Sequence, residues 1–172
     1  MSRAGSEEAL RTHFGPAFPL TRLIERWNSC WRADVAAAGI PAKPGLTELL
    51  GLLESRRIPA AVATSTEREN AEITLRVSGL AGRFAAVVTG DQVSRGKPAP
   101  DIYLEAARRL NVPPASCLAL EDSGHGIRSA NAAGMRTMLV PDLKPPTDDV
   151  MATASWVFVS LHEARDVIQG LI

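Results

Sequence analysis

Most of this chain alternates short apolar segments with amphipathic helices, and this alternation limits the fold more than any other feature. After Pro44-Gly45 the segments expected to form strands are 58–63, 84–88, 117–120, 137–140 and 156–159. The segments expected to form helices are 46–55, 67–78, 100–110, 126–133 and a last one from about residue 161. Strands that alternate with helices of this length are joined by right-handed crossovers and run parallel. We therefore expect an α/β, Rossmann-like core, a parallel sheet with helices on both faces.

The beginning of the chain has a different pattern. Apolar residues recur every three or four positions over 20–35, which predicts an amphipathic helix that ends at Gly39. A shorter helix is expected over 7–14, before Gly15-Pro16. Residues 1–42 are thus predicted to be helical and separate from an α/β domain over residues 43–172.

Composition excludes several classes of protein. The 172 residues include 19 basic and 19 acidic ones with no long run of either sign, so we expect neither a nucleic-acid nor a membrane-surface partner. The sequence contains neither a signal-like segment nor the roughly 20 consecutive apolar residues of a membrane span. Cys30 and Cys117 are isolated, which indicates buried, reduced thiols and a cytoplasmic location. Trp27 and Trp31 share an apolar helical stripe, and we expect them in a core rather than in a ligand pocket.

Two adjacent carboxylates, Glu121 and Asp122, directly follow the expected strand 117–120. Ligands of open α/β sheets bind at this carboxyl end of the strands. Paired carboxylates there suit Mg²⁺, which takes oxygen ligands from a few acids and from phosphate. The structural alternative is that Asp122 or Ser123 only caps the next helix. His125, in the same turn, either faces a substrate or is solvated.

A second candidate loop, Thr64-Ser65-Thr66, follows the expected strand 58–63. Hydroxyls and free backbone N–H groups at the positive end of a following helix can hold a phosphate. Alternatively, Ser65 or Thr66 only caps that helix.

The third candidate residue is Lys97, which lies between Gly96 and Pro98. The prolines of this loop limit where its ammonium group can reach. The alternative is a solvated surface lysine.

The three loops, taken in order, resemble the haloacid dehalogenase superfamily of phosphotransferases, and most closely the subgroup of β-phosphoglucomutase and phosphoglycolate phosphatase. The resemblance covers most of residues 44–140, in the segments PGLTELLGLLESRRIPAAVATST, VVTGDQVSRGKPAPDIYLEAARRLNVPP and LALEDSGHGIRSANAAGMRTMLV. It implies a haloacid dehalogenase-like core, with residues 1–42 as the remnant of a helical cap. It also implies a Mg²⁺-dependent phosphatase or phosphomutase that acts on a small phosphorylated metabolite.

The resemblance assigns a role to each loop. It implies that the Thr64 hydroxyl hydrogen-bonds the transferring phosphoryl group and that Ser65 and Thr66 supply nearby contacts. It implies that Lys97 neutralises the nucleophile and the phosphoryl oxygens.

It further implies that Glu121 and Asp122 hold Mg²⁺, with Ser123 supporting the turn. One motif of the family has no counterpart in these residues: the strand that ends in Asp-x-Asp-Gly-Thr, whose first aspartate attacks phosphorus and whose second is the general acid and base. Asp148 and Asp149 are adjacent, but they are expected in a loop after Pro145-Pro146 and do not end a strand.

We therefore expect a chain that is truncated or begins late, and that shows no turnover by itself. The alternative is a non-catalytic remnant that binds phosphate, metal or a partner. In the resembled fold the nucleophile strand lies between the strand that ends at Ala63 and the strand 117–120. Without it, these two strands either stay about 10 Å apart or close to about 4.8 Å and pair directly. We expect the gap, with unpaired backbone groups and low solubility.

Overall fold

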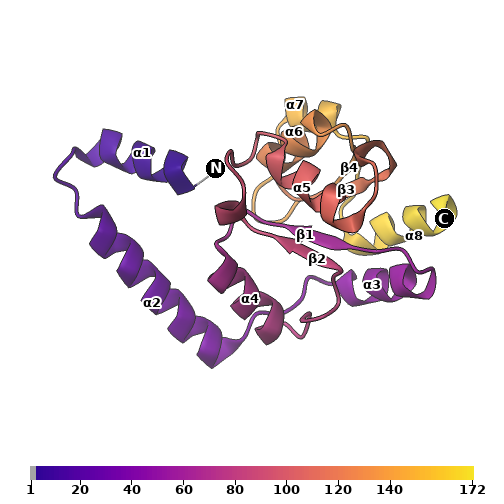
Figure 1. Ribbon diagram of the computed structural model, residues 1–172, viewed down its shortest axis with the longest axis horizontal. Coiled ribbons are helices and arrows are strands. Elements are labelled where there is room, and N and C mark those ends of the chain that lie inside the picture. Colours follow the sequence, from indigo (N-terminus) through magenta and orange to yellow (C-terminus); the bar gives the residue numbers. More distant parts are fainter. Residues whose placement is uncertain (1–2) are drawn as a thin grey trace.

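The computed structural model describes residues 3–172, with side chains from Glu7 onward. The helices are α1 (Arg3–Phe14), α2 (Leu20–Ala38), α3 (Leu46–Ser55), α4 (Arg68–Val77), α5 (Asp101–Leu110), α6 (Gly124–Ala132), α7 (Asp148–Thr153) and α8 (Leu161–Leu171). The strands are β1 (Ala61–Ala63), β2 (Ala86–Val88), β3 (Leu118–Glu121), β4 (Arg136–Leu139) and β5 (Trp156–Val157). Strands and helices alternate from α3 to α8 (Figure 1), which confirms the α/β class.

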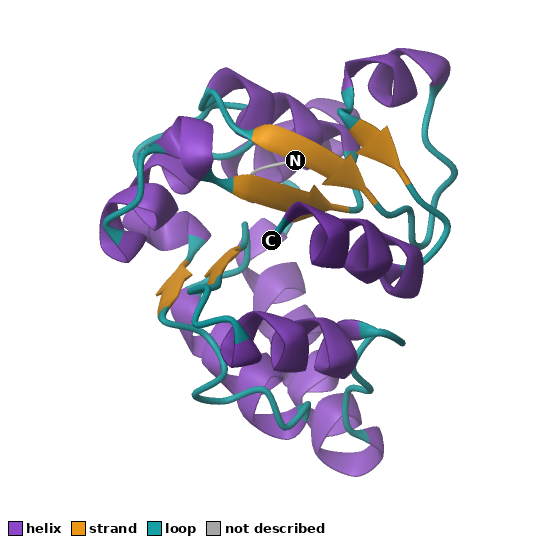
Figure 2. Ribbon diagram, turned by 90° about the vertical axis from the view of Figure 1, so that its right-hand side faces the viewer, coloured by secondary structure: helices purple, strands orange, loops and turns teal. Residues whose placement is uncertain are grey.

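The strands are all parallel but form two separate sheets. β1 pairs with β2, with Val62 opposite Val87. β3 pairs with β4, and β4 with β5. No ladder joins β1 to β3 in the described residues, and Figure 2 shows the two groups of strands apart. The expected break between these two strands is therefore present.

Three apolar clusters form the core, and the two larger ones lie on opposite sides of the strands. One combines α5 and α6 with small strand residues, and its largest fully buried side chain is Ile102. The other combines α3 and α8 with the three-stranded sheet through Leu49, Met138 and Ile168. Helices therefore cover both faces, as the crossover argument predicts.

The helices α1 and α2 extend away from this core (Figure 1). In α2, Leu20 and Val35 are buried, but the Trp27 side chain is 70% exposed, so its assignment to a core was wrong. The thiols also differ from expectation, because Cys30 is exposed and Cys117 is half-buried. The apolar residues of α2 recur at helical spacing, but this spacing does not show whether another surface covers them.

The segment after β4 corrects a second expectation. Asp148 and Asp149 form the first turn of α7 instead of a loop. Acidic residues suit this position because the helix dipole is positive there. Asp149 also accepts a hydrogen bond from Arg128 of α6 at 2.6 Å.

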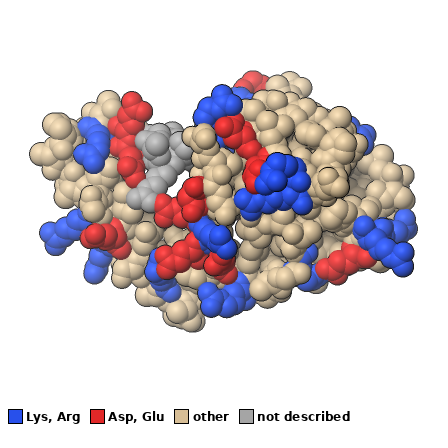
Figure 3. Space-filling model, viewed as in Figure 1, with Lys and Arg blue, Asp and Glu red and all other residues tan. Residues whose placement is uncertain are grey.

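Charged side chains of both signs are interspersed on the face seen in Figure 3. Several are paired, such as Arg95 with Asp101 at 2.9 Å. Arg32 of α2 likewise contacts Glu69 of α4 at 2.7 Å, which ties the N-terminal helices to the core. Among the described residues, no helix combines the length and the apolar character that crossing a membrane requires.

Candidate active site

The three candidate loops meet in one cavity of about 430 Å³ at the carboxyl ends of β1 and β3. Its lining includes residues from every candidate loop: Thr64, Ser65, Lys97, Glu121, Asp122, Ser123 and His125. Thr66 is not part of this lining. The structure thus brings together all but one of the residues singled out from the sequence.

Lys97 is the most constrained of these residues. Its Nζ lies 3.0 Å from the carbonyl oxygen of Ala63, at the end of β1, and also donates to Oε1 of Glu121, at the end of β3. The Lys97 and Glu121 side chains are only 10% and 7% exposed. Lys97 is therefore a buried, paired cation that connects the two sheets, and the surface-lysine alternative is wrong.

Tyr103 of α5 completes this cluster, and the sequence analysis did not identify it. Its hydroxyl donates to Oε1 of Glu121, and its ring lies 5.0 Å from Nζ of Lys97. Burial, together with the negative charge of Glu121, raises the pKa of Tyr103 well above its usual range, so the hydroxyl stays protonated and remains a donor. A tyrosine on the buried face of an amphipathic helix needs a polar partner, and that was the available signal.

The acidic turn both caps a helix and exposes a carboxylate to the cavity, the two interpretations that the sequence allows. Ser123 caps α6 by accepting a hydrogen bond from the N–H of Gly126 at 3.2 Å. Its hydroxyl also lies 3.2 Å from Oε2 of Glu121, to which it donates. Asp122 is exposed, so its carboxylate is available to a ligand in the cavity.

Gly126 leaves the space that the Glu121 carboxylate occupies. A Cβ at this position would lie 1.9 Å from Oε2 of Glu121. Gly90 has a similar function for the hydroxyl loop, because a Cβ there would lie 2.5 Å from the backbone oxygen of Ser65. Both glycines are thus required by close approach.

The hydroxyl loop is held by hydrogen bonds that its backbone N–H groups donate. The N–H of Thr66 donates to Oγ1 of Thr64 at 3.1 Å. Neither Ser65 nor Thr66 caps α4; its N-cap residue is Glu67, without a side-chain cap bond. The capping alternative for this loop is therefore wrong, and the Ser65 side chain remains on the cavity wall.

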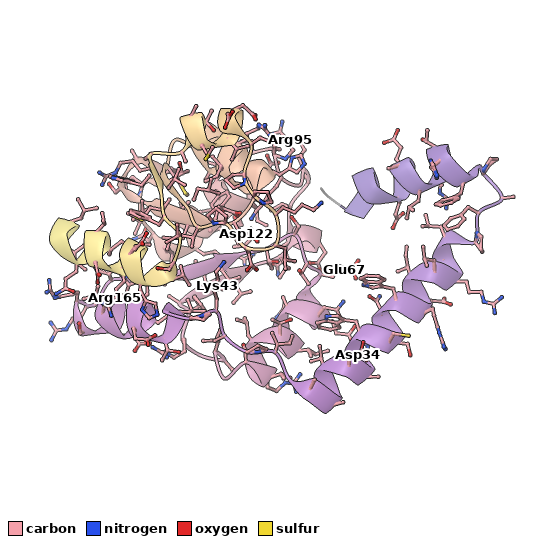
Figure 4. All side chains as sticks on the ribbon, turned by 180° about the vertical axis from the view of Figure 1, so that it is seen from behind. Asp34, Lys43, Glu67, Arg95, Asp122 and Arg165 are labelled. Carbon is pink, nitrogen blue, oxygen red and sulfur yellow. The ribbon has the colours of Figure 1, made fainter. Side chains whose placement is uncertain are left out.

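Two charged residues of the cavity wall were not predicted. Lys43, before α3, lies 3.3 Å from the carboxylate of Asp142, which follows β4. Lys43 and Asp122 both line the cavity, and both are labelled in Figure 4. His125 is exposed at the rim. Partial loss of water around its ring, together with the charge of Arg128, lowers the pKa of His125 from its usual value.

The carboxylates of the cavity provide only some of the oxygen ligands that a magnesium ion needs. The described residues contain no group of three or more potential metal-ligating His, Cys, Asp or Glu side chains. Glu121 is already engaged by Lys97, Tyr103 and Ser123, which leaves Asp122 as the available carboxylate of the acidic turn. Mg²⁺ commonly keeps several waters and takes one or two carboxylates together with phosphate oxygens. The residues present fit an ion held in that way.

Comparison with known proteins places this geometry in a family. The family model of haloacid dehalogenase-like hydrolases matches residues 4–134. The chain belongs to this family. It is 40% identical over 133 residues to the protein CbbY of Rhodobacter capsulatus, covering 76% of this chain and 58% of that protein. It is 45% identical over 92 residues to a phosphorylated carbohydrates phosphatase of Thermotoga maritima, covering 54% of this chain and 43% of that protein. The chain thus spans about half the length of these curated relatives.

A solved structure agrees with the assignment. The crystal structure of a putative β-phosphoglucomutase from Thermotoga maritima superposes with a TM-score of 0.81 and 28% identity. The match covers 100% of this chain and 80% of that chain. The fold class and the likeness to β-phosphoglucomutase are therefore confirmed.

Proposed function

We propose that this chain carries the phosphoryl-binding and metal-binding part of a phosphatase or phosphomutase that acts on small phosphorylated carbohydrates. The observation that carries the proposal is the convergence of Thr64, Lys97, Glu121 and Asp122 on one cavity at the carboxyl ends of two parallel strands. The names of the relatives support the substrate class. Residues 43–172 would form the core and residues 1–42 part of a cap.

The residues act by positioning and by neutralising charge. The Thr64 hydroxyl binds a phosphoryl oxygen, with Ser65 next to it, and Thr66 keeps the turn in shape through its N–H, which donates to Oγ1 of Thr64. Lys97 supplies a fixed positive charge. Asp122 would hold Mg²⁺, and Glu121, held in place by Lys97 and Tyr103, would add its negative charge beside the ion. The ion, when bound, neutralises charge on the phosphoryl group.

The 172 residues contain no Asp-x-Asp sequence. Among the cavity-lining residues, the charged groups stabilise an anion, but none matches the expected aspartyl nucleophile. We therefore propose that this polypeptide binds inorganic phosphate and Mg²⁺ without turnover.

Isothermal titration with inorganic phosphate in the presence of Mg²⁺ tests the binding, and release of p-nitrophenol from p-nitrophenyl phosphate tests turnover. Asp122→Asn should weaken Mg²⁺ binding at least tenfold, and Lys97→Met should do the same for phosphate. Lys144→Met, an exposed lysine outside the cavity lining, is the control. Undiminished phosphate binding by a folded Lys97→Met variant would overturn the site assignment, and Mg²⁺-dependent hydrolysis by the 172-residue chain would overturn the inactivity.

A further inference from the structure

A second cavity, of about 250 Å³, lies at the opposite ends of the strands from the candidate active site. Its wall is formed by the end of α3, by the segment that leads into β1 and by residues just before β2. Ala60 directly precedes β1 and Ala85 directly precedes β2, so the cavity lies at the amino ends of both strands. It shares no lining residue with the cavity that contains Lys97 and Asp122. A ligand bound here would therefore not occupy the candidate active site.

Apolar side chains form most of this wall. Leu50, which is buried, and Leu53, which is half-buried, contribute from α3, and Ile58 contributes from the segment after it. The carbonyl of Ala60 is occupied, because it accepts a hydrogen bond from the N–H of Ala85 at 2.8 Å. An apolar wall of this kind favours a ligand with a hydrocarbon body, whose burial releases water from the side chains.

The cavity wall carries one positive charge that is not balanced within the wall. Arg83 is paired with Glu54 at 2.5 Å. Arg57 also lines the cavity, and among the described residues its guanidinium has neither an ion pair nor a hydrogen bond. A ligand that enters beside Arg57 therefore meets a free cation, and an anionic group would complete its pairing.

The backbone of Arg57 is held in a conformation that is unfavourable for this residue type. Its φ is 55°, in the left-handed region, where arginine is strained. The corresponding position at the end of α5 has the same φ but is occupied by Asn111, a residue type that tolerates it better. Strained residues are concentrated at ligand sites, where the conformation places a functional side chain.

The end of α3 does not oppose an anion as strongly as an open helix end would. The carbonyl of Leu53 accepts a hydrogen bond from the N–H of Ile58 at 2.9 Å, and the carbonyl of Glu54 accepts one from the N–H of Arg57 at 3.0 Å. These two carbonyls of the last turn are therefore satisfied, and less of the negative end of the helix dipole faces the cavity.

We propose that this cavity binds a small aliphatic monocarboxylate, with its hydrocarbon chain against Leu50 and Leu53 and its carboxylate paired with Arg57. The planar guanidinium matches a carboxylate with two parallel hydrogen bonds. A chain of about six carbons suits a cavity of this volume, because small-molecule sites enclose most of the surface of their ligand. Inorganic phosphate fits less well, since it has no apolar body to cover the leucines.

Titration of the ¹⁵N-labelled 172-residue chain with hexanoate, followed by the chemical shifts of its amides, tests this inference. We expect saturable shifts at the amides of Ile58, Ala60 and Ala85. Affinity should rise roughly two- to fourfold for each methylene from butanoate to hexanoate, because each one buries more apolar surface. Acetate lacks the chain and 1-hexanol lacks the charge, so both should bind at least tenfold more weakly.

Matched variants separate the charge from the cavity. Arg57→Asn removes the cation but tolerates the left-handed backbone, and it should weaken hexanoate binding at least tenfold. Arg56→Asn removes the same charge from the next residue, which is outside the lining, and should change the affinity less than twofold. Ala85→Leu places a larger side chain in the cavity and should abolish binding, while unchanged shifts elsewhere show that the variant is folded.

Several results would overturn the proposal. Equal binding of 1-hexanol would mean non-specific apolar association, and equal binding of acetate or inorganic phosphate at the same amides would mean a general anion site. Undiminished binding by Arg57→Asn would remove the assigned partner of the carboxylate. Shifts centred on Thr64 and Lys97 would place hexanoate in the candidate active site instead. None of these outcomes depends on whether the chain binds phosphate and Mg²⁺ in that site.

Discussion

Replacing Gly126 by alanine should destabilise the protein, although alanine is the better helix former. The new Cβ would lie 1.9 Å from the Glu121 carboxylate. The backbone of α6 is fixed by its own hydrogen bonds, so the carboxylate must rotate away. It then loses its bonds to Lys97 and Tyr103.

The size of the effect follows from the burial of this pair. Lys97 and Glu121 are 10% and 7% exposed, and leaving a buried charge without its partner costs about 3–5 kcal/mol. The displaced carboxylate can still reach water in the cavity, which reduces the loss to about 3 kcal/mol. A gain of up to about 1 kcal/mol from replacing a helical glycine offsets part of it. We expect a net loss of about 2 kcal/mol, or a decrease of roughly 1 M in the urea midpoint.

Urea unfolding followed by circular dichroism measures this loss. Gly51→Ala is the matched control, because a Cβ added to this helical glycine would meet open space, with nothing within 4 Å, and the change should stabilise the protein by about 0.5–1 kcal/mol. In a Glu121→Ala background, Gly126→Ala should no longer destabilise. Equal losses in both backgrounds, or a Gly126→Ala variant as stable as the original protein, would refute the reasoning.

Two further substitutions test local features. Arg57 has a φ of 55° at the end of α3, where the N–H of Ile58 donates to the carbonyl of Leu53. A left-handed conformation is strained for arginine but not for glycine, so Arg57→Gly should raise the free energy of unfolding by about 1 kcal/mol. A thermal unfolding midpoint that does not rise would contradict this strain. Ser123→Ala removes the cap of α6 and should cost about 1 kcal/mol. The loss should also speed amide exchange at Gly126, and an unchanged rate there would argue against the cap.

The sequence predicts helices and strands well where hydrophobic periodicity agrees with the positions of proline and glycine. The helix over 46–55 begins after Pro44-Gly45 and is found at Leu46–Ser55. Strands are predicted with less accuracy, because an apolar run indicates burial and not pairing: a strand over 58–63 was expected, but the strand found spans only Ala61–Ala63. The helix α7 was missed, since its six residues are too few to show a period.

The candidate site likewise contains residues that the sequence predicts and residues that it does not. Lys97, Glu121 and the hydroxyl loop are recognisable from residue type and position after a strand. Tyr103 and Gly126 act through contacts between elements distant in sequence, a hydroxyl at the Glu121 carboxylate and a missing Cβ beside it. Such contacts depend on how α5 and α6 pack, and no local pattern encodes them.

The division of the strands into two sheets bears on how the molecule loses its structure. In a continuous sheet the hydrogen-bond ladder ties every strand to its neighbours, so that the strands unfold together. In the described part of the chain the ladder stops at β1 and β3. Side chains connect the halves, among them the apolar cluster beneath α5 and Lys97 with its partners. The helix α5 packs on β1 and β2 and reaches Glu121 through Tyr103, so it is one of the elements through which the two halves are coupled in unfolding. Local opening of the β1–β2 half should need less free energy than global unfolding, which makes this half the more dynamic side of the candidate site.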